Sequence, residues 1–354
     1  MNTRRKFLCT VGAIGTAGVM SSLTSGLASS LASGLTSGQF KTADNSASRI
    51  YKPIKFGVIA DLHCDLTPDV DARLKSFMKK VEEEKPDFLI SLGDFAFAIP
   101  ANDQFVKRFA SSKAPAYHVL GNHEMDRVDK KDATAFLGMP SPYYSFDRGG
   151  YHFVVMDPNY IYDGEKFIDY EKGNYFQFGG RVSYMSDAHC DWLEDDLRRT
   201  ELPTFLFSHQ SLLHNNGGIP NRAYIQRILE RENERCGYRK ALGCFNGHHH
   251  QDFYRAMSGI HYFSINSVSY LWHDEKMPGR YSDELNKKHP ILDNMALYKD
   301  PLFCFVSIDS SGRLSLRGIR SEWAVTPPAS PTSKSVGFGN EIAPVIANRE
   351  VVLG

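Results

Sequence analysis

Short apolar runs alternate with amphipathic stretches from about residue 50 onwards. Residues 55–60 and 88–92 have the continuous apolar character of buried strands. Between them, apolar side chains recur at helical spacing over residues 70–81, and Pro86 ends that helix. The pattern therefore opens with a strand, a helix and a second strand.

The same alternation continues through most of the chain. We expect further strands at residues 117–120, 153–156, 205–207, 242–246 and 262–265, and helices at 104–110 and 187–199. Residues 303–308 and 314–317 predict a hairpin, because Asp309-Ser310-Ser311-Gly312 between them are turn formers. Strands that first alternate with helices and then pair directly predict a layered α/β domain with a mixed or partly antiparallel sheet.

The N-terminal segment differs in character from this domain. Arg4 and Arg5 open a positively charged start, an apolar run follows over residues 8–20, and a Ser-, Gly- and Ala-rich stretch extends to about residue 38. This order is typical of a secretory leader, and paired arginines before Phe-Leu resemble a bacterial twin-arginine signal. A membrane anchor is the alternative, but the apolar run is short for a span of about 20 residues.

We therefore predict three regions. Residues 1–45 form a signal peptide and flexible linker, residues 50–320 form one catalytic domain, and residues 321–354 form a loosely ordered, proline-containing tail. Residues 160–182, rich in Tyr, Phe and Gly, are interpreted as an inserted loop. The leader predicts recognition by the twin-arginine export machinery, a periplasmic or extracellular location, and no stable membrane anchor after cleavage.

Charge and cysteine content exclude several classes. The chain has 41 basic and 41 acidic residues, and loss of Arg4, Arg5 and Lys6 with a leader leaves 38 against 41. Long nucleic acid is therefore not expected as a partner, and a small substrate fits better. The six cysteines contain no C-x-x-C pair, which argues against a zinc finger or a dithiol site. A disulfide between Cys236 and Cys244 stays open.

Polar residues follow five of the predicted strands. The five strand ends carry Asp61-Leu62-His63, Gly93-Asp94, Gly121-Asn122-His123-Glu124, Ser208-His209 and Gly247-His248-His249-His250. Ligand sites of α/β sheets gather at the carboxyl ends of strands. Carboxylate, amide and imidazole donors suit Mn, Zn, Fe or Ni. In an extended chain, donors two residues apart, such as those in Asp61-Leu62-His63 and in the histidine run, point to the same side.

Each residue also has a structural interpretation. Asp61, Asp94 and Asn122 are acceptable turn or cap residues, and Gly93 and Gly121 are acceptable turn glycines. A histidine after an apolar strand is commonly a core residue, and a histidine run is commonly a surface tract. A purely structural role for this set would require all of these interpretations to hold at five strand ends at once. A metal site is therefore the favoured interpretation.

The ordered set of motifs resembles the calcineurin-like metallophosphoesterase superfamily. The resemblance spans residues 57–250, and residues 143–157 and 190–194 add flanking pieces of it. It implies an α/β fold of the family's kind, a four-layer αββα sandwich with two mixed β-sheets. It also implies two divalent metal ions, drawn from Mn, Fe, Zn and Ni.

The resemblance implies a role for each site residue. One metal would be held by Asp61, His63 and His250, the other by Asn122, His209 and His248, and Asp94 would bridge the two. His123 would face the substrate and protonate the leaving oxygen, and Glu124 would orient and polarise it. Two ions held in this way activate a water molecule and clamp the reacting oxygens.

The implied activity is hydrolysis of a small phosphomonoester or phosphodiester. A diphosphatase acting on nucleotide-sugar or CDP-alcohol type substrates is the alternative enzyme, and an inactive metal- or phosphate-binding protein is the alternative of another class. Purple acid phosphatases carry a tyrosine where this chain has Phe97, so a ferric-tyrosinate site is not expected. Class III cyclic-nucleotide phosphodiesterases have the same set of motifs as this chain, so the chain resembles them as well.

Overall fold

The computed structural model of the protein describes residues 51–179, 181–273, 276–325 and 342–354. The predicted leader and linker over residues 1–45 lie outside this part of the chain. The described residues belong to one compact unit that extends from Ser48 to Gly354.

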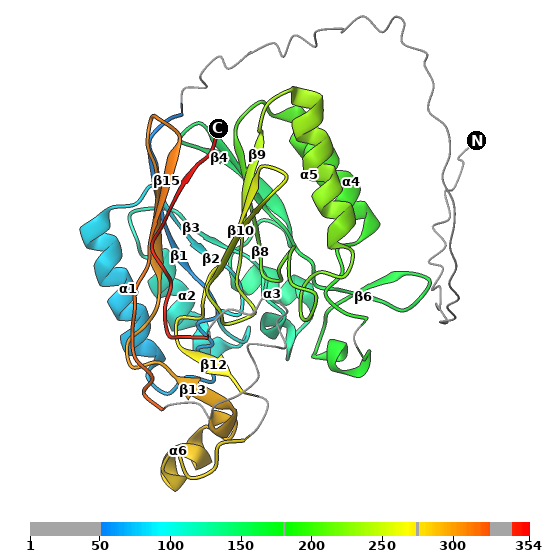
Figure 1. The fold of residues 1–354 in the computed structure, drawn as a ribbon. Coiled ribbons are helices and arrows are strands. Elements are labelled where there is room, and N and C mark those ends of the chain that lie inside the picture. Colours follow the sequence, from blue (N-terminus) through cyan, green and yellow to red (C-terminus); the bar gives the residue numbers. More distant parts are fainter. Residues whose placement is uncertain (1–50, 180, 274–275, 326–341) are drawn as a thin grey trace, which may run out of the picture. The chain divides into compact units, whose positions relative to one another are not determined.

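Two six-stranded sheets dominate the structure (Figure 1). The first has the order β16-β15-β14-β1-β2-β3, with β1–β3 parallel and the other neighbours antiparallel. Its strands are β1 (Ile54–Ile59), β2 (Phe88–Ser91), β3 (Ala116–His118), β14 (Cys304–Ile308), β15 (Arg313–Arg317) and β16 (Arg349–Val352). The predicted hairpin is β14–β15.

The second sheet has the order β10-β11-β9-β8-β5-β4, with four parallel strands in the middle and an antiparallel strand at each edge. Its strands are β4 (Tyr144–Arg148), β5 (Tyr151–Val155), β8 (Thr204–Ser208), β9 (Ala241–Asn246), β10 (Phe253–Met257) and β11 (Ile260–Ser264). Both sheets are therefore mixed, as predicted.

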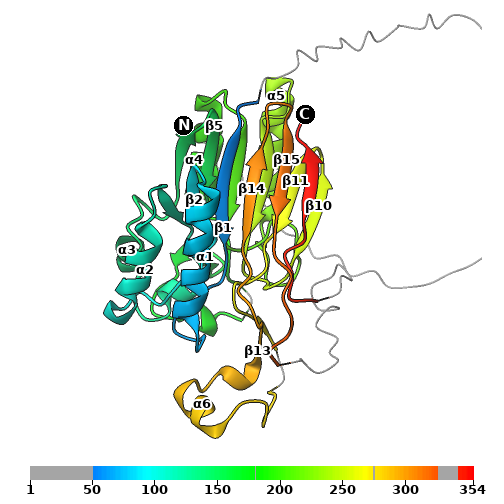
Figure 2. The same ribbon diagram turned by 90° about the vertical axis from the view of Figure 1, so that its left-hand side faces the viewer.

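The remaining elements are helices and two small ribbons. The helices are α1 (Val70–Glu84), α2 (Asp103–Ala110), α3 (Lys130–Phe136), α4 (Asp187–Arg199), α5 (Arg222–Cys236) and α6 (Asp283–Lys288), with 3-10 turns η1 (Pro100–Asn102), η2 (His123–Met125), η3 (Asn174–Gln177) and η4 (Leu292–Asn294). The ribbons pair β6 (Tyr160–Tyr162) with β7 (Phe167–Asp169), and β12 (Tyr270–Trp272) with β13 (Met295–Leu297). Figure 2 shows α6 beyond the ends of the main strands.

Aromatic side chains fill the space between the sheets. Phe56 of the first sheet lies 6.0 Å from Phe153 and 5.8 Å from Phe245 of the second, measured between ring centroids. Phe88 lies 4.8 Å from Phe153 in the same way. Because side chains alternate across a strand, the neighbours of these phenylalanines point outwards to the helical layers.

The outward side chains meet the helices. In β5, Phe153 belongs to the central core, whereas Val154 joins a second core with Leu193 of α4 and Leu229 of α5. On the other sheet, Phe77 of α1 packs against Phe305 of β14. Helices thus cover the outer face of each sheet (Figure 1), and the predicted four-layer αββα architecture is confirmed.

The C-terminal segment differs from the prediction. A loosely ordered tail was expected over residues 321–354, but residues 349–352 form β16 on the edge of β15. Ile346 and Leu353 are buried there, so this part of the tail is held by apolar packing and strand pairing. The prediction is wrong for residues 342–354; residues 326–341 lie outside the described part of the chain.

Two further observations concern disulfide bonds and membrane-spanning helices. The five cysteines in the described ranges, Cys64, Cys190, Cys236, Cys244 and Cys304, are all free thiols, so no bridge joins Cys236 to Cys244. None of the helices in this part of the protein has both the length and the apolar character that crossing a bilayer requires.

A buried ion pair fixes α5 against the second sheet. The Lys240 ammonium is fully buried, donates to Glu232 at 2.8 Å and also donates to the Leu197 carbonyl. We predict that Lys240→Ala lowers the free energy of unfolding by about 2 kcal/mol, since the buried Glu232 carboxylate loses one of its two cationic partners and keeps Arg235. Urea unfolding measures this. Lys107→Ala, which breaks an exposed pair, is the control and should cost under about 0.5 kcal/mol; equal losses would contradict the prediction.

Candidate metal centre

The five polar strand ends converge at one place. Asp61 and His63 follow β1, Asp94 follows β2, and Asn122 follows β3, while the second sheet contributes His209 after β8 and the histidine run after β9. Parallel strands of both sheets present their carboxyl ends here. Two groups of potential metal ligands result, each with donor atoms within 4.8 Å of one another.

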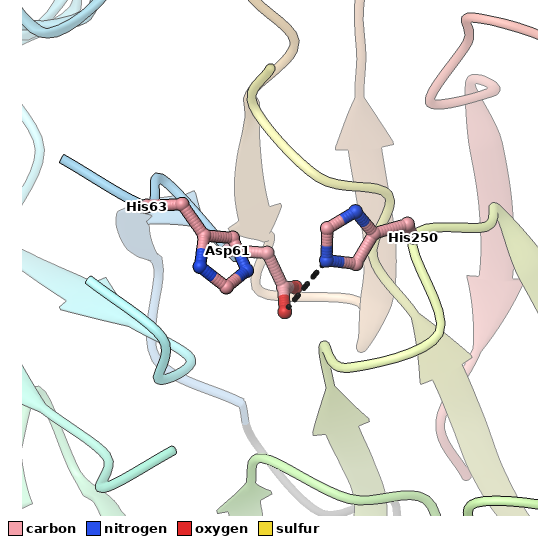
Figure 3. Close-up of side chains that lie close together, drawn as sticks. All are labelled: Asp61, His63 and His250. Atoms are coloured by element: carbon pink, nitrogen blue, oxygen red, sulfur yellow. Dashed lines mark ion pairs between the residues drawn. The ribbon is translucent and has the colours of Figure 1, made fainter. Parts of the chain in front are cut away.

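The first group consists of Asp61, His63 and His250, all buried (Figure 3). His250 Nε2 lies 3.4 Å from Asp61 Oδ1, and the rings of His63 and His250 lie 5.3 Å apart. The second group consists of Asp94, His209 and His248. His209 Nε2 lies 3.0 Å from Asp94 Oδ2 and 3.1 Å from His248 Nδ1.

Asp94 lies between the two groups. Its Oδ2 is 3.0 Å from His209 Nε2 in the second group and 3.6 Å from His63 Nε2 in the first. Its Oδ1 accepts a hydrogen bond of 2.9 Å from the His123 backbone N–H, which fixes the carboxylate's orientation. This is the position that a bridging carboxylate requires.

The backbone at the site is strained. Among the described residues, five of the nine non-glycine residues with positive φ are expected ligands: Asp61, His63, Asp94, His248 and His250, with φ between 49° and 69°. Left-handed backbone costs a non-glycine residue on the order of 1 kcal/mol and persists where surrounding structure enforces it. The expectation that these donors reach one side through extended chain is therefore wrong; left-handed turns bring them together instead.

At two positions of the motifs, neighbouring atoms leave room for glycine only. A Cβ on Gly121 would lie 2.1 Å from Asp94 Oδ1, and a Cβ on Gly93, whose φ is +93°, would lie 2.6 Å from His209 Nδ1. Any side chain at either position would displace a ligand. Both glycines are therefore needed for the geometry of the site, and they are more than ordinary turn residues.

Backbone carbonyls orient two of the histidines. His209 Nδ1 donates to the Leu92 carbonyl at 2.8 Å, and His250 Nδ1 donates to the Tyr270 carbonyl at 2.7 Å. Each bond leaves Nε2 as the atom that faces the carboxylates. Fixing the second ring nitrogen in this way is how proteins prepare histidine for a metal.

Electrostatics also prepare two imidazoles for ligation. Burial lowers the pKa of His63 well below its ordinary value, although Asp94 opposes the shift. Burial likewise lowers the pKa of His248, and His209 adds to that effect. Both rings are consequently neutral at pH 7 and have a lone pair available for a cation.

The residues present fit a pair of cations. His63 Nε2, His250 Nε2 and Asn122 Oδ1 are buried and have no hydrogen-bond partner within the described residues. Buried polar atoms without partners are costly, and a cation would satisfy all three. The donor set contains carboxylate, amide and imidazole only, which suits Mn, Fe, Zn or Ni.

His123 lies beside the two groups and is held by Asp126. Its Nδ1 donates to Asp126 Oδ2 at 2.8 Å, so Nε2 is the atom left for a substrate. Burial lowers the pKa of His123, but Asp94 and the bond to Asp126 outweigh burial and raise the pKa to about 9. From the protein's own charges alone, the ring is therefore a cation at neutral pH.

Glu124 has a different position from the one expected. Its carboxylate accepts hydrogen bonds from the backbone N–H groups of Asp94 at 3.2 Å, Phe95 at 2.5 Å and Gly121 at 2.8 Å. Burial, with a further contribution from Asp94, raises its pKa to about 8. Glu124 thus holds the turn that carries Asp94, and the orienting contact to His123 belongs to Asp126.

The inserted segment reaches the site through one tyrosine. The Tyr175 hydroxyl donates to Asp126 and accepts from Asn122 Nδ2 at 3.4 Å. Tyr175 is buried, whereas the adjacent Phe176 is 70 % exposed. The aromatic run of the insert therefore supports the site through Tyr175, while the Phe176 ring faces solvent.

Comparison with known proteins identifies the family. The calcineurin-like phosphoesterase profile matches residues 54–252, which is more than half of the chain and includes every expected ligand. The chain belongs to the calcineurin-like phosphoesterase family.

Two relatives of this calcineurin-like phosphoesterase are informative. The serine/threonine-protein phosphatase CPPED1 of Bos taurus is 26 % identical over 125 residues, which cover 32 % of this chain and 35 % of that protein. The chain thus matches about a third of that relative's length. The crystal structure of a dimetal phosphatase from Danio rerio has 15 % identity and a TM-score of 0.54, and covers 77 % of this chain and 99 % of that one. That likeness is one of fold.

The other histidines of this phosphoesterase are mostly structural. His118, His152 and His189 are buried away from the two ligand groups, in packing or ion-pair contacts. His249 Nε2 donates to the Asn216 carbonyl at 3.0 Å, in the loop between β8 and α5, and its ring stacks on His214. The interpretation of His249 as a non-ligand between two ligands agrees with these contacts.

Proposed function

We propose that this protein is a dinuclear metal-dependent phosphoesterase that hydrolyses phosphomonoesters or phosphodiesters of small molecules. The observation that carries the proposal is the place of Asp94, whose Oδ2 lies 3.0 Å from one ligand group and 3.6 Å from the other. Asp61, His63 and His250 would hold one cation, and His209 and His248 the other. Asn122 Oδ1, which is buried and has no hydrogen-bond partner in the described part of the chain, would be a further ligand of the second cation. Two such cations supply an activated water and neutralise phosphate charge when bound.

The protein's own residues supply the proton for the leaving group. His123 Nδ1 is occupied by Asp126, so Nε2 carries the proton that the departing ester oxygen needs. The ring lies beside both ligand groups, with its centroid 5.2 Å from that of His63 and its backbone N–H on Asp94. His123 would therefore protonate the leaving oxygen as the phosphorus–oxygen bond breaks.

Metal dependence and reaction type are tested together. Purified protein is stripped with a chelator and assayed on matched phosphomonoesters, phosphodiesters and pyrophosphates, before and after addition of Mn, Fe, Zn or Ni. We expect no hydrolysis by stripped protein and recovery with at least one metal, with a mono- or diester as the best substrate. Release of a nucleoside monophosphate from a pyrophosphate as the main reaction would favour a diphosphatase instead. Full activity of metal-free protein would contradict the proposal.

Asp126 is expected to position His123 during this reaction. We predict that Asp126→Asn lowers kcat about 10- to 100-fold with KM within a factor of two, since loss of an orienting carboxylate leaves substrate contacts in place. Steady-state kinetics with a good and a poor leaving group measure this, and the poor leaving group should show the larger loss. Asp129→Asn, which neutralises the N-cap residue of α3 in the same loop and leaves an oxygen that can still cap the helix, is the matched control. Equal effects from both variants would contradict the role.

We also propose that the protein is exported by the twin-arginine route. Arg4, Arg5 and the apolar run over residues 8–20 support this, and export of folded protein would allow the metals to be loaded beforehand. A fusion of residues 1–45 to a reporter should reach the periplasm, and Arg4→Lys/Arg5→Lys should retain it in the cytoplasm. Export that persists in the double variant would contradict the proposal.

A further inference from the structure

Strand β12 forms one wall of the candidate metal centre. Side chains alternate along a strand, so Tyr270 and Trp272 share one face and Leu271 takes the other. Leu271 packs into the central core. The Tyr270 ring lies 4.7 Å from His250 and 5.3 Å from His63, between centroids. The face that carries the two aromatic residues is therefore turned towards the first ligand group.

Trp272 is the outer part of this wall. Its ring lies 6.0 Å from His63 and 6.1 Å from His250, and it meets the Tyr270 ring at 5.0 Å and 90°. Pairing of Trp272 with Met295 of β13 holds its backbone, and a small core of Tyr270, Leu292 and Met295 lies behind. The indole is half-buried, with a fixed support on one side and an open side.

The open side of Trp272 borders a pocket of about 300 Å³. The residues that line this pocket are Asp94, His123, Asn216, Gly217, His248, His249 and Trp272. All of them except Trp272 are polar, charged or glycine. A substrate whose phosphate lies at Asp94 and His123 therefore meets a single apolar surface in this pocket, and that surface is an indole.

An indole ring attracts two kinds of group, a planar aromatic ring or a cation. The lining of the pocket decides between them. Asp94 is the one carboxylate among the residues that line the pocket, and the two cations of the proposed centre would engage it. A quaternary ammonium group would therefore find no negative partner there and no cage of several aromatic residues, whereas an uncharged ring that stacks on one indole needs neither.

We infer that Trp272 is a specificity-determining residue that selects phosphate esters in which an aryl group or a nucleobase lies near the phosphate. This inference rests on the proposed function and names the substrate class of the same site. The aromatic group stacks on or against the indole while the phosphate occupies the metal centre. Esters with a saturated group of equal size lack the stacking contribution.

Binding of two phosphonates tests the inference without any chemical step. Phenylphosphonate and cyclohexylphosphonate are similar in size and neither is hydrolysed, so calorimetry on metal-loaded protein compares the rings alone. We expect wild-type protein to bind phenylphosphonate about 5-fold more tightly. Trp272→Leu should abolish this preference, and Trp272→Phe should keep part of it. Trp192→Leu, which removes an indole from α4, is the matched control and should keep it whole.

The possible results separate the inference from the proposed function. Equal affinity for the two phosphonates in wild-type protein, or an unchanged preference in Trp272→Leu, overturns the inference and leaves the function standing. Tighter binding of a trimethylammoniopropyl phosphonate would assign the indole to a cation and also overturn it. Failure of metal-loaded protein to bind any phosphonate would overturn both. The comparison of the two phosphonates in wild-type protein needs no variant. The inference can therefore be tested even if the Trp272 variants fold poorly.

Discussion

Asp94→Asn should reduce kcat/KM by at least about 1,000-fold, equivalent to about 4 kcal/mol of transition-state stabilisation. The carboxylate approaches both ligand groups, at 3.0 Å from His209 and 3.6 Å from His63, and lies nearer to His209 than the Asp61 carboxylate does at 3.9 Å. An amide in its place has one oxygen and no charge, so it cannot hold two cations together. Bound metal should fall from two ions per chain to one or none.

The Asp94→Asn substitution removes the negative charge of the side chain without disturbing the fold around it. Asn tolerates the left-handed backbone at this position, where φ is 50°, and its side-chain oxygen can still accept from the His123 N–H. We therefore expect an unchanged fold by circular dichroism. Asp196→Asn, which neutralises another buried carboxylate paired with His152, is the control and should keep both metals and activity. Wild-type metal content and activity in Asp94→Asn would contradict the bridging role.

His123→Ala should lower kcat by a factor of about 100 to 10,000 while both metals stay bound. His123 lies beside the ligand groups, with its ring 5.2 Å from that of His63, and belongs to neither group, while the bond from Nδ1 to Asp126 leaves Nε2 to donate a proton. The loss should be largest for alkyl esters, whose leaving oxygen needs the proton, and smallest for p-nitrophenyl esters. Parallel kinetics and metal analysis measure both effects.

A histidine outside the site gives the comparison for this variant. His289→Ala removes a half-buried ring at the end of α6 that contacts none of the candidate ligands. It should leave kcat within a factor of two. Equal sensitivity of alkyl and p-nitrophenyl esters to His123→Ala would argue against proton transfer by this residue. Undiminished activity in His123→Ala would exclude it.

The ligands could be predicted from sequence because each lies within four residues of the end of a strand. The direction of parallel strands fixes one shared edge within each sheet, so the ends of β1 and β2 lie together, as do those of β8 and β9. The packing of the two sheets then brings the two edges together. The conformation at these ends could not be predicted, since left-handed backbone at Asp61 or His250 depends on contacts with the other sheet. The order of the motifs along the chain therefore predicts which residues form the site, whereas the conformation of the site is known only from the tertiary structure.

The supporting residues lack a sequence signal of this kind. Asp126 and Tyr175 are 49 residues apart and meet because the insert packs on the loop after β3. Trp272 reaches the pocket through a two-stranded ribbon whose partner strand begins at Met295. Such contacts depend on how loops fold back on the sheets, and local spacing does not encode that.

Helix α5 was missed although its pattern was present. Ile225, Ile228, Leu229 and Glu232 are its buried residues, at spacings of three and four. Most of the other positions are charged, which hides a narrow apolar stripe in a polar sequence. Glu232 pairs with Arg235 on the same helix and with Lys240 just before β9, and the second of these partners is known only from the folded structure.

Metal analysis of the purified wild-type protein, combined with anomalous X-ray scattering from its crystals, tests the central claim most directly. We predict two divalent ions per chain, about 3.5–4 Å apart, on either side of the Asp94 carboxylate. One ion would contact Asp61, His63 and His250, and the other Asn122, His209 and His248. A protein that binds no metal under these conditions, or binds it away from Asp94, would contradict the account.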